Sequence, residues 1–167
     1  LADQGFVVLV IDGRGTPYRG VAWEQSVHRS YLDHALEDQV EGLHAAAERF
    51  PFLDLSRVAI RGWSYGGYLT LGALLRRPDV FHAGISGAPV TDMRLYDTHY
   101  TERYLGDPDE NADVYDANSL LPSAPALRRP LLLIHGLADD NVVAAHTLLL
   151  SAALPLLFAF YLAAVPA

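Results

Sequence analysis

The chain is predicted to fold as an α/β protein with a mostly parallel sheet, and three observations support this. Short runs of apolar residues recur along the 167 residues, and segments with a helical period separate them. Loops rich in glycine and polar residues follow several of the runs. Apolar runs without alternation are typical of strands covered on both faces, and strands that alternate with helices pair in parallel.

The first two elements are predicted to be a strand and an amphipathic helix. Phe6–Ile11 is a continuous apolar run, and a glycine-rich loop at residues 12–15 ends it. From Leu36 to Phe50 apolar residues recur at three- and four-residue steps, and acidic residues occupy the other faces until Pro51 stops the pattern. We therefore expect a buried strand, followed by a helix that packs one face on the sheet.

The same alternation continues to the last third of the chain. Residues 58–60 and Leu131–Ile134 have the pattern of buried strands, His82–Gly87 that of a weaker one, and residues 68–75 that of a helix. A long segment rich in Asp, Tyr and Pro, without regular structure of its own, is predicted before Leu131. Because parallel strands present their carboxyl ends at one edge, four loops are expected to converge there: residues 12–15, 62–66, 86–90 and 135–142.

Composition excludes several classes of protein. The 12 basic and 20 acidic residues give a formal charge of −8, and no cluster of Lys and Arg could follow a phosphate backbone, so nucleic acid is not an expected partner. Cysteine is absent, which excludes disulfides and thiolate metal sites. We predict no cofactor, no metal and a cytoplasmic location, and no signal peptide is visible in a chain that does not begin with methionine.

The end of the chain has two readings. Beyond Asp140 no side chain carries a fixed charge, and Leu148–Val165 approaches the roughly 20 apolar residues of a membrane-spanning helix, although a serine and a proline interrupt it. A buried helix followed by a core strand over Leu156–Val165 explains the run equally well. We favour the second reading, because the run directly follows a loop motif, and we expect no membrane contact.

The stretch Arg61–Gly67 holds a Gly-x-Ser-x-Gly pattern between a predicted strand and a predicted helix. This context is the one that a nucleophile elbow requires, with glycines at 62 and 66 expected to avoid clashes of Cβ atoms. Ser64 would then stand exposed at the carboxyl edge of the sheet, and the Tyr65 N–H could donate to an oxyanion. The alternative is an ordinary loop. With the elbow near the middle of the chain, the elements predict a partial α/β-hydrolase core over residues 1–167, expected to be truncated at both ends.

A serine nucleophile needs a histidine as base and a carboxylate that orients it, and in this fold the order along the chain is serine, acid, histidine. Asp139, next to Asp140 after the Leu131 strand, is the candidate acid, although adjacent acids also cap helices. Six of the seven histidines precede Asp139, and the seventh, His146, lies on the predicted next helix. His135 is expected to be a structural residue whose side chain forms hydrogen bonds with the backbone. We therefore expect the base to lie outside this chain.

Three motifs closely resemble the catalytic domain of the prolyl oligopeptidase family, in its dipeptidyl peptidase IV branch. They are residues 62–67, 96–104 and 135–142, and the resemblance extends over about residues 5–151. It implies a serine peptidase that releases N-terminal X-Pro or X-Ala dipeptides from peptides through an acyl-enzyme. It makes Ser64 the nucleophile, Asp139 the acid and the Tyr65 N–H an oxyanion donor.

The resemblance also implies a pocket for proline. Its substrate-binding residues would be Val90, Tyr96, Tyr100, Asn141 and Val142, with the Tyr65 ring beside them. Asn141 would hold a substrate carbonyl, and Met93 stands where some members carry tryptophan. Proline has no N–H and is selected by packing against aromatic faces. Without the resemblance, tyrosines at 96, 100 and 104 would be read as the core face of one helix.

The relatives implied by the resemblance have further parts. They carry an upstream β-propeller domain, which residues 1–167 do not include, and in full length we expect them to be homo-oligomeric. Two alternatives remain open from the sequence. One is an acylaminoacyl peptidase or esterase on the same fold, and the other is a catalytically inert domain that lacks the triad histidine.

Overall fold

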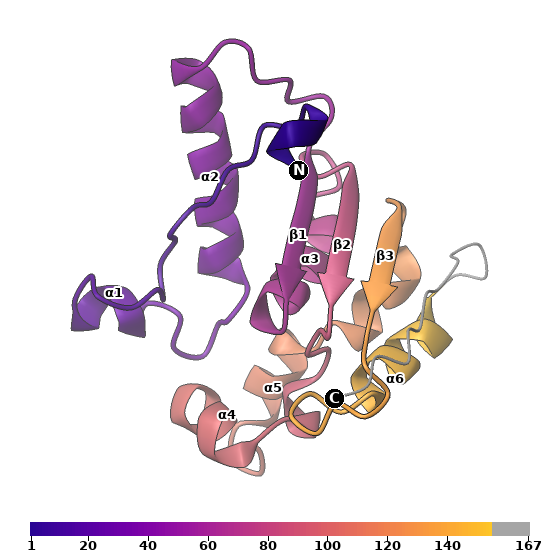
Figure 1. The fold of residues 1–167 in the computed structure, drawn as a ribbon. Helices are drawn as coiled ribbons and strands as arrows, with labels where there is room; N and C mark the ends of the chain where they lie inside the picture. Colours follow the sequence, from indigo (N-terminus) through magenta and orange to yellow (C-terminus); the bar gives the residue numbers. More distant parts are fainter. Residues whose placement is uncertain (155–167) are drawn as a thin grey trace.

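The computed structural model describes residues 1–154, so the strand predicted over Leu156–Val165 lies outside the described residues. A parallel three-stranded sheet in the order β1-β2-β3 forms its centre (Figure 1). The strands are β1 (Ala59–Trp63), β2 (Ala83–Gly87) and β3 (Leu131–Ile134). The helices are α1 (Val21–Gln25), α2 (Asp33–Arg49), α3 (Tyr65–Arg76), α4 (Thr98–Leu105), α5 (Ala112–Asn118) and α6 (Ala145–Ala153). This architecture confirms the predicted α/β class.

Helix α3 packs directly on the sheet. An added Cβ at Gly84 of β2 would lie 2.6 Å from the Leu74 side chain, which shows how closely helix and strand approach. Leu71 and Leu74 from α3 and Leu133 from β3 are each 1% exposed. Burial of such side chains contributes about 1.5 to 3 kcal/mol each, so this layer stabilises the fold substantially.

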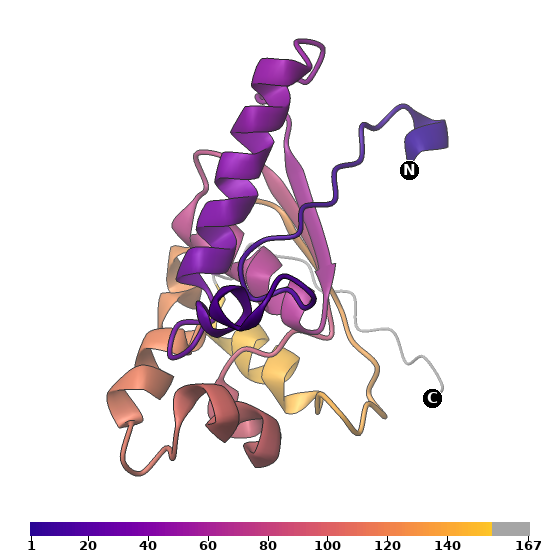
Figure 2. The same cartoon turned by 90° about the vertical axis from the view of Figure 1, so that its left-hand side faces the viewer.

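Helix α2 follows the predicted pattern and packs beside α3 (Figure 2). Its buried side chains include Leu36, Val40 and Leu43, while its acidic residues lie outside the core. Phe50 lies just beyond the helix and is 40% exposed, so the apolar stripe ends one turn earlier than predicted.

The segment Phe6–Ile11 is not a strand, which corrects the prediction. It pairs with none of the three strands, and Phe6 and Val10 are 61% and 90% exposed. A strand needs a neighbour for its backbone N–H and C=O groups, and apolar composition alone does not provide one. Only the end of the segment is anchored, by a bond from Gln39 Nε2 to the Ile11 carbonyl of 3.1 Å.

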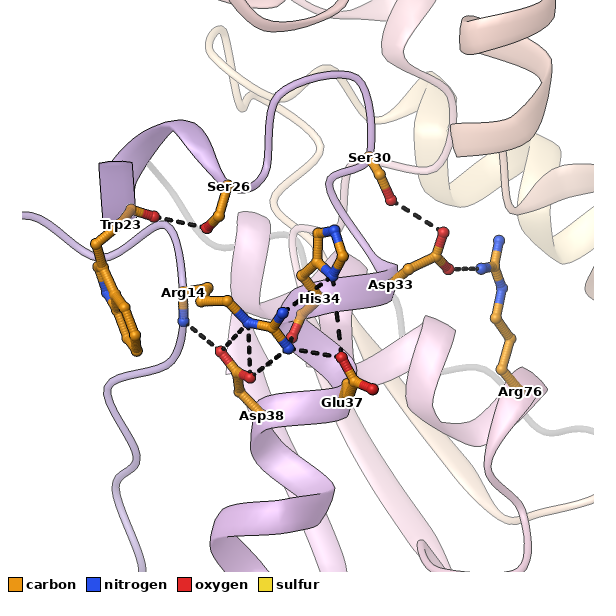
Figure 3. A network of polar contacts seen from close by, with 9 residues as sticks. All are labelled: Arg14, Trp23, Ser26, Ser30, Asp33, His34, Glu37, Asp38 and Arg76. Carbon is orange, nitrogen blue, oxygen red and sulfur yellow. Dashed lines mark hydrogen bonds and ion pairs between the residues drawn. The ribbon is translucent and has the colours of Figure 1, made fainter. Parts of the chain in front are cut away.

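The loop after this segment is attached to α2 by an ionic network (Figure 3). The Arg14 side chain donates to Asp38 over 2.7 Å and to Glu37 over 2.6 Å, and one of its nitrogens lies 3.2 Å from His34 Nδ1. Residues 12–15 were predicted to join the other loops at the sheet edge. The Arg14 side chain instead contacts Glu37 and Asp38 in the first half of α2.

The segment between β2 and β3 is more regular than predicted. It contains a 3-10 turn at Met93–Leu95, helices α4 and α5, and a second 3-10 helix at Leu121–Ala126. Figure 1 shows α4 and α5 beyond the arrowheads of the strands, at the carboxyl edge of the sheet. Across residues 1–154 no helix has both the length and the apolar character that a membrane span requires.

Candidate active site

Ser64 lies between β1 and α3, in the sharp turn that the sequence predicts. Its backbone has φ 54° and ψ −117°, a conformation that non-glycine residues rarely adopt. The Ser64 N–H donates to the Gly87 carbonyl over 2.9 Å, and the Ser64 carbonyl accepts from the Tyr68 N–H over 3.0 Å. These bonds at both sides of the residue hold the strained turn in place.

The three glycines around Ser64 differ in whether their surroundings leave room for a side chain. A Cβ at Gly62 would collide with the Gly66 carbonyl, as predicted. At Gly66 itself an added Cβ would meet nothing, so that part of the prediction is wrong. Gly67 is the second position under steric constraint, because a Cβ there would lie 2.6 Å from the Gly87 carbonyl oxygen.

Tyr65 is the first residue of α3, so its backbone N–H has no acceptor within the helix. The positive end of the helix dipole lies at the same place. An oxyanion formed at a carbon attacked by Ser64 would find this N–H beside it. The phenol of Tyr65 points elsewhere, because its hydroxyl donates to the Tyr31 carbonyl over 2.6 Å.

A small cavity of about 40 Å³ opens beside Ser64. It is walled mainly by aromatic and apolar side chains from four parts of the chain: Tyr31, Tyr65, Val90, Met93, Tyr96 and Tyr100. Tyr31 and Tyr100 stack with ring centroids 6.3 Å apart, and Tyr96 meets Tyr100 edge to face at 5.6 Å. Such flat, rigid walls suit a compact apolar ring.

Three tyrosines of this cavity are held in the uncharged form at neutral pH. Burial raises the pKa of Tyr31, Tyr65 and Tyr100 above the ordinary value. Neighbouring phenols raise it further at Tyr31 and Tyr65, and at Tyr100 the polar contact with the Tyr31 hydroxyl opposes the rise without cancelling it. A neutral aromatic wall therefore faces Ser64 over the physiological pH range.

The acid loop follows β3. One carboxylate oxygen of Asp139 accepts from the N–H groups of Asn141 (3.1 Å) and Val142 (2.9 Å), so the carboxylate is fixed by the backbone. Its other oxygen lies 3.9 Å from His135 Nε2. Asp140 is exposed and has no comparable bonds within residues 1–154. The geometry therefore favours Asp139 over its neighbour as the orienting acid.

Tyr96 connects the acid loop to the cavity. Its hydroxyl lies 3.2 Å from Asn141 Oδ1, while its ring lines the wall beside Ser64. This contact engages the amide oxygen of Asn141 and leaves the amide NH₂ as a donor. The Val142 side chain is 2% exposed and does not line the cavity. Its contact with a substrate therefore stays a prediction.

The two histidines nearest to Asp139 are structural. His135 is fully buried; its Nε2 lies 2.7 Å from the Val142 carbonyl and must carry the proton, so its Nδ1, 2.6 Å from Thr147 Oγ1, is the acceptor. His146 is also fully buried and accepts from the Thr91 N–H over 3.1 Å. Burial lowers the pKa of His146. His135 is bonded through both ring nitrogens and His146 through Nδ1 alone, and full burial leaves both rings unsuited to serve Ser64.

Tyr31 is the one wall residue that the sequence did not indicate. It lies in the segment before α2 that has no clear period, and it reaches the cavity only because the chain returns there from α1. The Asn118 side chain fixes its position by accepting from the Tyr31 N–H over 2.9 Å. No local pattern around Tyr31 could have revealed a contact across 87 residues.

A strained serine turn at the carboxyl end of a parallel strand, with a helix N-terminus behind it and a fixed aspartate two strands away, defines the catalytic core of an α/β-hydrolase. Comparisons with known proteins agree with this assignment to the α/β-hydrolase class. The model of the prolyl oligopeptidase family matches residues 1–157, and the chain belongs to that family.

Its relatives are dipeptidyl peptidases. Human dipeptidyl peptidase 8 is 49% identical over 153 residues, which are 90% of this chain and 17% of the relative. A probable dipeptidyl-aminopeptidase B of Aspergillus oryzae is 40% identical over 150 residues, 88% of this chain and 16% of the relative. The crystal structure of Porphyromonas gingivalis dipeptidyl peptidase 4 matches with a TM-score of 0.83 and 40% identity, over 90% of this chain and 22% of that one. The predicted resemblance is confirmed, and this chain spans about a sixth of its curated relatives.

Proposed function

We propose that this chain carries the nucleophile and the acid of a serine peptidase that releases N-terminal X-Pro or X-Ala dipeptides. The observation that carries the proposal is Ser64, held in a strained turn at the mouth of a cavity walled by tyrosines. Peptide chemistry also fits the names of the relatives, which are dipeptidyl peptidases.

In the proposed reaction Ser64 Oγ attacks the carbonyl carbon of the second residue of a peptide. The base removes the proton of Ser64, and the oxyanion is stabilised by the Tyr65 N–H. Collapse of the tetrahedral intermediate expels the amine of the third residue, which takes up that proton, and leaves an ester on Ser64. Water then hydrolyses the ester and frees the dipeptide. Asp139 orients the protonated base.

The wall of the Ser64 cavity supports the choice of proline. The proline ring offers no N–H, so packing against neutral aromatic faces is the main means of selection. Alanine would fill less of the same space, and a few missing apolar contacts cost about 1 to 3 kcal/mol. The Asn141 amide NH₂ would hold a substrate carbonyl next to Tyr96.

The test is hydrolysis of glycyl-prolyl-p-nitroanilide by the complete product of the gene. We expect turnover, with a preference for proline over alanine and leucine at the second position. Ser64→Ala should lower kcat about a thousandfold or more. Ser123→Ala is the matched control, because Ser123 is exposed and does not line the cavity beside Ser64, and it should keep full activity.

The possible results separate the proposals. Activity that survives in Ser64→Ala would remove Ser64 from the mechanism. If the intact protein cleaves short acyl esters or blocked amino acids but no dipeptidyl substrate, the acylaminoacyl peptidase or esterase reading is the correct one.

One observation favours a second candidate for the function, a catalytically inert domain. The two histidines closest to Asp139 are committed to the core, and within residues 1–154 no histidine bonds Ser64. We expect residues 1–167 alone to react at least a hundredfold more slowly with a fluorophosphonate probe than the complete gene product does, because the proton of Ser64 has no acceptor. Equal labelling rates would show that the chain holds its own base.

A further inference from the structure

The lining of the cavity beside Ser64 has an outer and an inner part. Some of the lining residues are at least partly exposed and surround the opening: Ser64, Tyr65, Tyr96 and Tyr100. The others are no more than 5% exposed and form the inner end: Tyr31, Val90 and Met93. Tyr31 has the bulkiest side chain of these three, so the depth of the cavity depends chiefly on its ring.

The backbone of Tyr31 is held on both sides. Its N–H donates to Asn118 Oδ1 over 2.9 Å, and its carbonyl accepts from the Tyr65 hydroxyl over 2.6 Å. Asn118 is 3% exposed, and its amide NH₂ also donates to the Arg29 carbonyl over 3.0 Å. These bonds tie the segment before α2 to the end of α5. None of them uses the Tyr31 hydroxyl, so they place the residue independently of its polar group.

The ring of Tyr31 packs against three other aromatic rings. Its centroid lies 5.3 Å from that of Tyr104 and 6.1 Å from that of Tyr65, which it meets edge to face. It also stacks on Tyr100 with the centroids 6.3 Å apart. Protein interiors are close-packed, so a buried ring enclosed in this way has little room to turn aside. The inner end of the cavity is therefore a rigid wall.

The volume of the cavity limits the side chain that it accepts. A cavity needs about 10 to 15 Å³ to hold one water molecule, so about 40 Å³ gives room for about three groups of that size. The three methylene groups of a proline ring fit this space, and so does the methyl group of alanine. Leucine is larger and phenylalanine is larger still. Either would have to displace the inner wall.

We propose that Tyr31 is a specificity-determining residue, whose ring excludes side chains larger than those of proline and alanine from the second position of a substrate. The inference rests on the proposed release of dipeptides and deepens it. Tyr31 acts by occupying space, because a longer side chain would have to enter the volume that its ring fills. The residue therefore needs to offer little surface to a substrate that fits.

The test compares two substrates of the complete gene product, glycyl-prolyl-p-nitroanilide and glycyl-leucyl-p-nitroanilide. Tyr31→Ala removes the ring and opens the inner end to leucine. The kcat/KM of the prolyl substrate divided by that of the leucyl substrate should therefore fall at least about tenfold. A smaller fraction of folded protein lowers both values equally and leaves their ratio unchanged. The ratio thus distinguishes a role in specificity from a role in stability.

Two further variants isolate the ring of Tyr31. Tyr31→Phe keeps the ring and the backbone bonds, so it should restore the ratio to within about threefold of that of the unmodified protein. Tyr104→Ala removes a ring of the same size that packs against Tyr31 and does not line the cavity. It should change the ratio by less than about threefold.

Several results would overturn the proposal. They are an active Tyr31→Ala protein with an unchanged ratio, a Tyr31→Phe protein that behaves like Tyr31→Ala, and an equal fall of the ratio in Tyr104→Ala. Absence of dipeptidyl hydrolysis by the unmodified protein contradicts the proposed function itself, and the inference fails with it, before any variant is compared. If Tyr31→Ala fails to fold by circular dichroism, Tyr31→Leu decides in its place. Leucine keeps the core apolar and is shorter than tyrosine, so the ratio should fall at least about threefold.

Discussion

Two apolar runs of this chain are similar in composition but differ in structure, because one is a paired strand and the other is unpaired and exposed. Leu131–Ile134 is the strand β3, hydrogen-bonded to β2, with Leu133 1% exposed. Phe6–Val10 is extended and unpaired, and each of its side chains is at least 40% exposed. The difference teaches that aliphatic and β-branched residues make a segment able to pair, while the presence of a neighbour decides whether it does.

The two regions are also attached by different forces. β3 is secured by backbone bonds to β2 and by burial against the core. The N-terminal segment is attached through Ile11 and through the bonds of Arg14 to α2. Because ionic bonds at a partly exposed site contribute less than burial of core side chains, mutations in the two regions should differ strongly in effect.

The largest effect is expected in β3. Leu133→Ala removes a fully buried side chain and leaves a cavity, so we expect a loss of about 2 to 5 kcal/mol in the free energy of unfolding. Urea denaturation followed by circular dichroism measures it. A loss below about 1 kcal/mol would show that β3 is less tightly packed than its burial indicates.

An intermediate effect is expected at the Arg14 network. Burial tends to raise the pKa of Asp38, but its bonds from Arg14 outweigh this and leave the pKa below the ordinary 3.8. The stabilisation is therefore complete above the ordinary pKa and is lost as the pH falls through the lower folded value.

Asp38→Asn should lower the free energy of unfolding by about 1 kcal/mol at pH 7, and by less near pH 3. Denaturation at the two pH values measures the difference. Glu41→Gln, on the exposed face of the same helix and without an ion pair among residues 1–154, is the control and should change stability by less than about 0.5 kcal/mol. An equal loss at both pH values would mean that Asp38 acts through packing and not through its charge.

The smallest effect is expected in the unpaired segment. Val10→Thr replaces a side chain that is 90% exposed by one of similar shape, so the free energy of unfolding should change by less than about 0.5 kcal/mol. The same substitution in a paired run would place a hydroxyl in the core. A large loss at Val10 would therefore show that Phe6–Val10 is covered in solution.

The sequence predicted most of the fold because the informative patterns were local. Alternation of apolar runs and helical periods located the three strands, α2 and α3, and Pro51 and Pro78 correctly limited the two helices. The errors arose where the outcome depends on distant partners. The exposure of Phe6–Val10 depends on what lies beside it, and α4 and α5 were not assigned because they are only eight and seven residues long, about two helical turns each.

The candidate site was predictable for a different reason. The elbow at Ser64 is a short motif whose steric requirement is visible in the glycines themselves, and Asp139 follows an unmistakable strand. The cavity wall was only partly predictable, since Tyr31 reaches it through tertiary contacts. The role of Gly66 was misjudged, because which of two adjacent glycines faces a neighbouring backbone depends on the path of β2.

The backbone at Ser64 has a consequence for how this protein evolves. Angles of φ 54° and ψ −117° cost a serine about 1 to 3 kcal/mol, a sum that the surrounding hydrogen bonds must outweigh. The most stable sequence for this architecture would therefore carry glycine at position 64 and would have no hydroxyl there. Selection for chemistry and selection for robustness oppose each other at this single residue, so retention of serine there would itself be evidence that a lineage still uses the reaction.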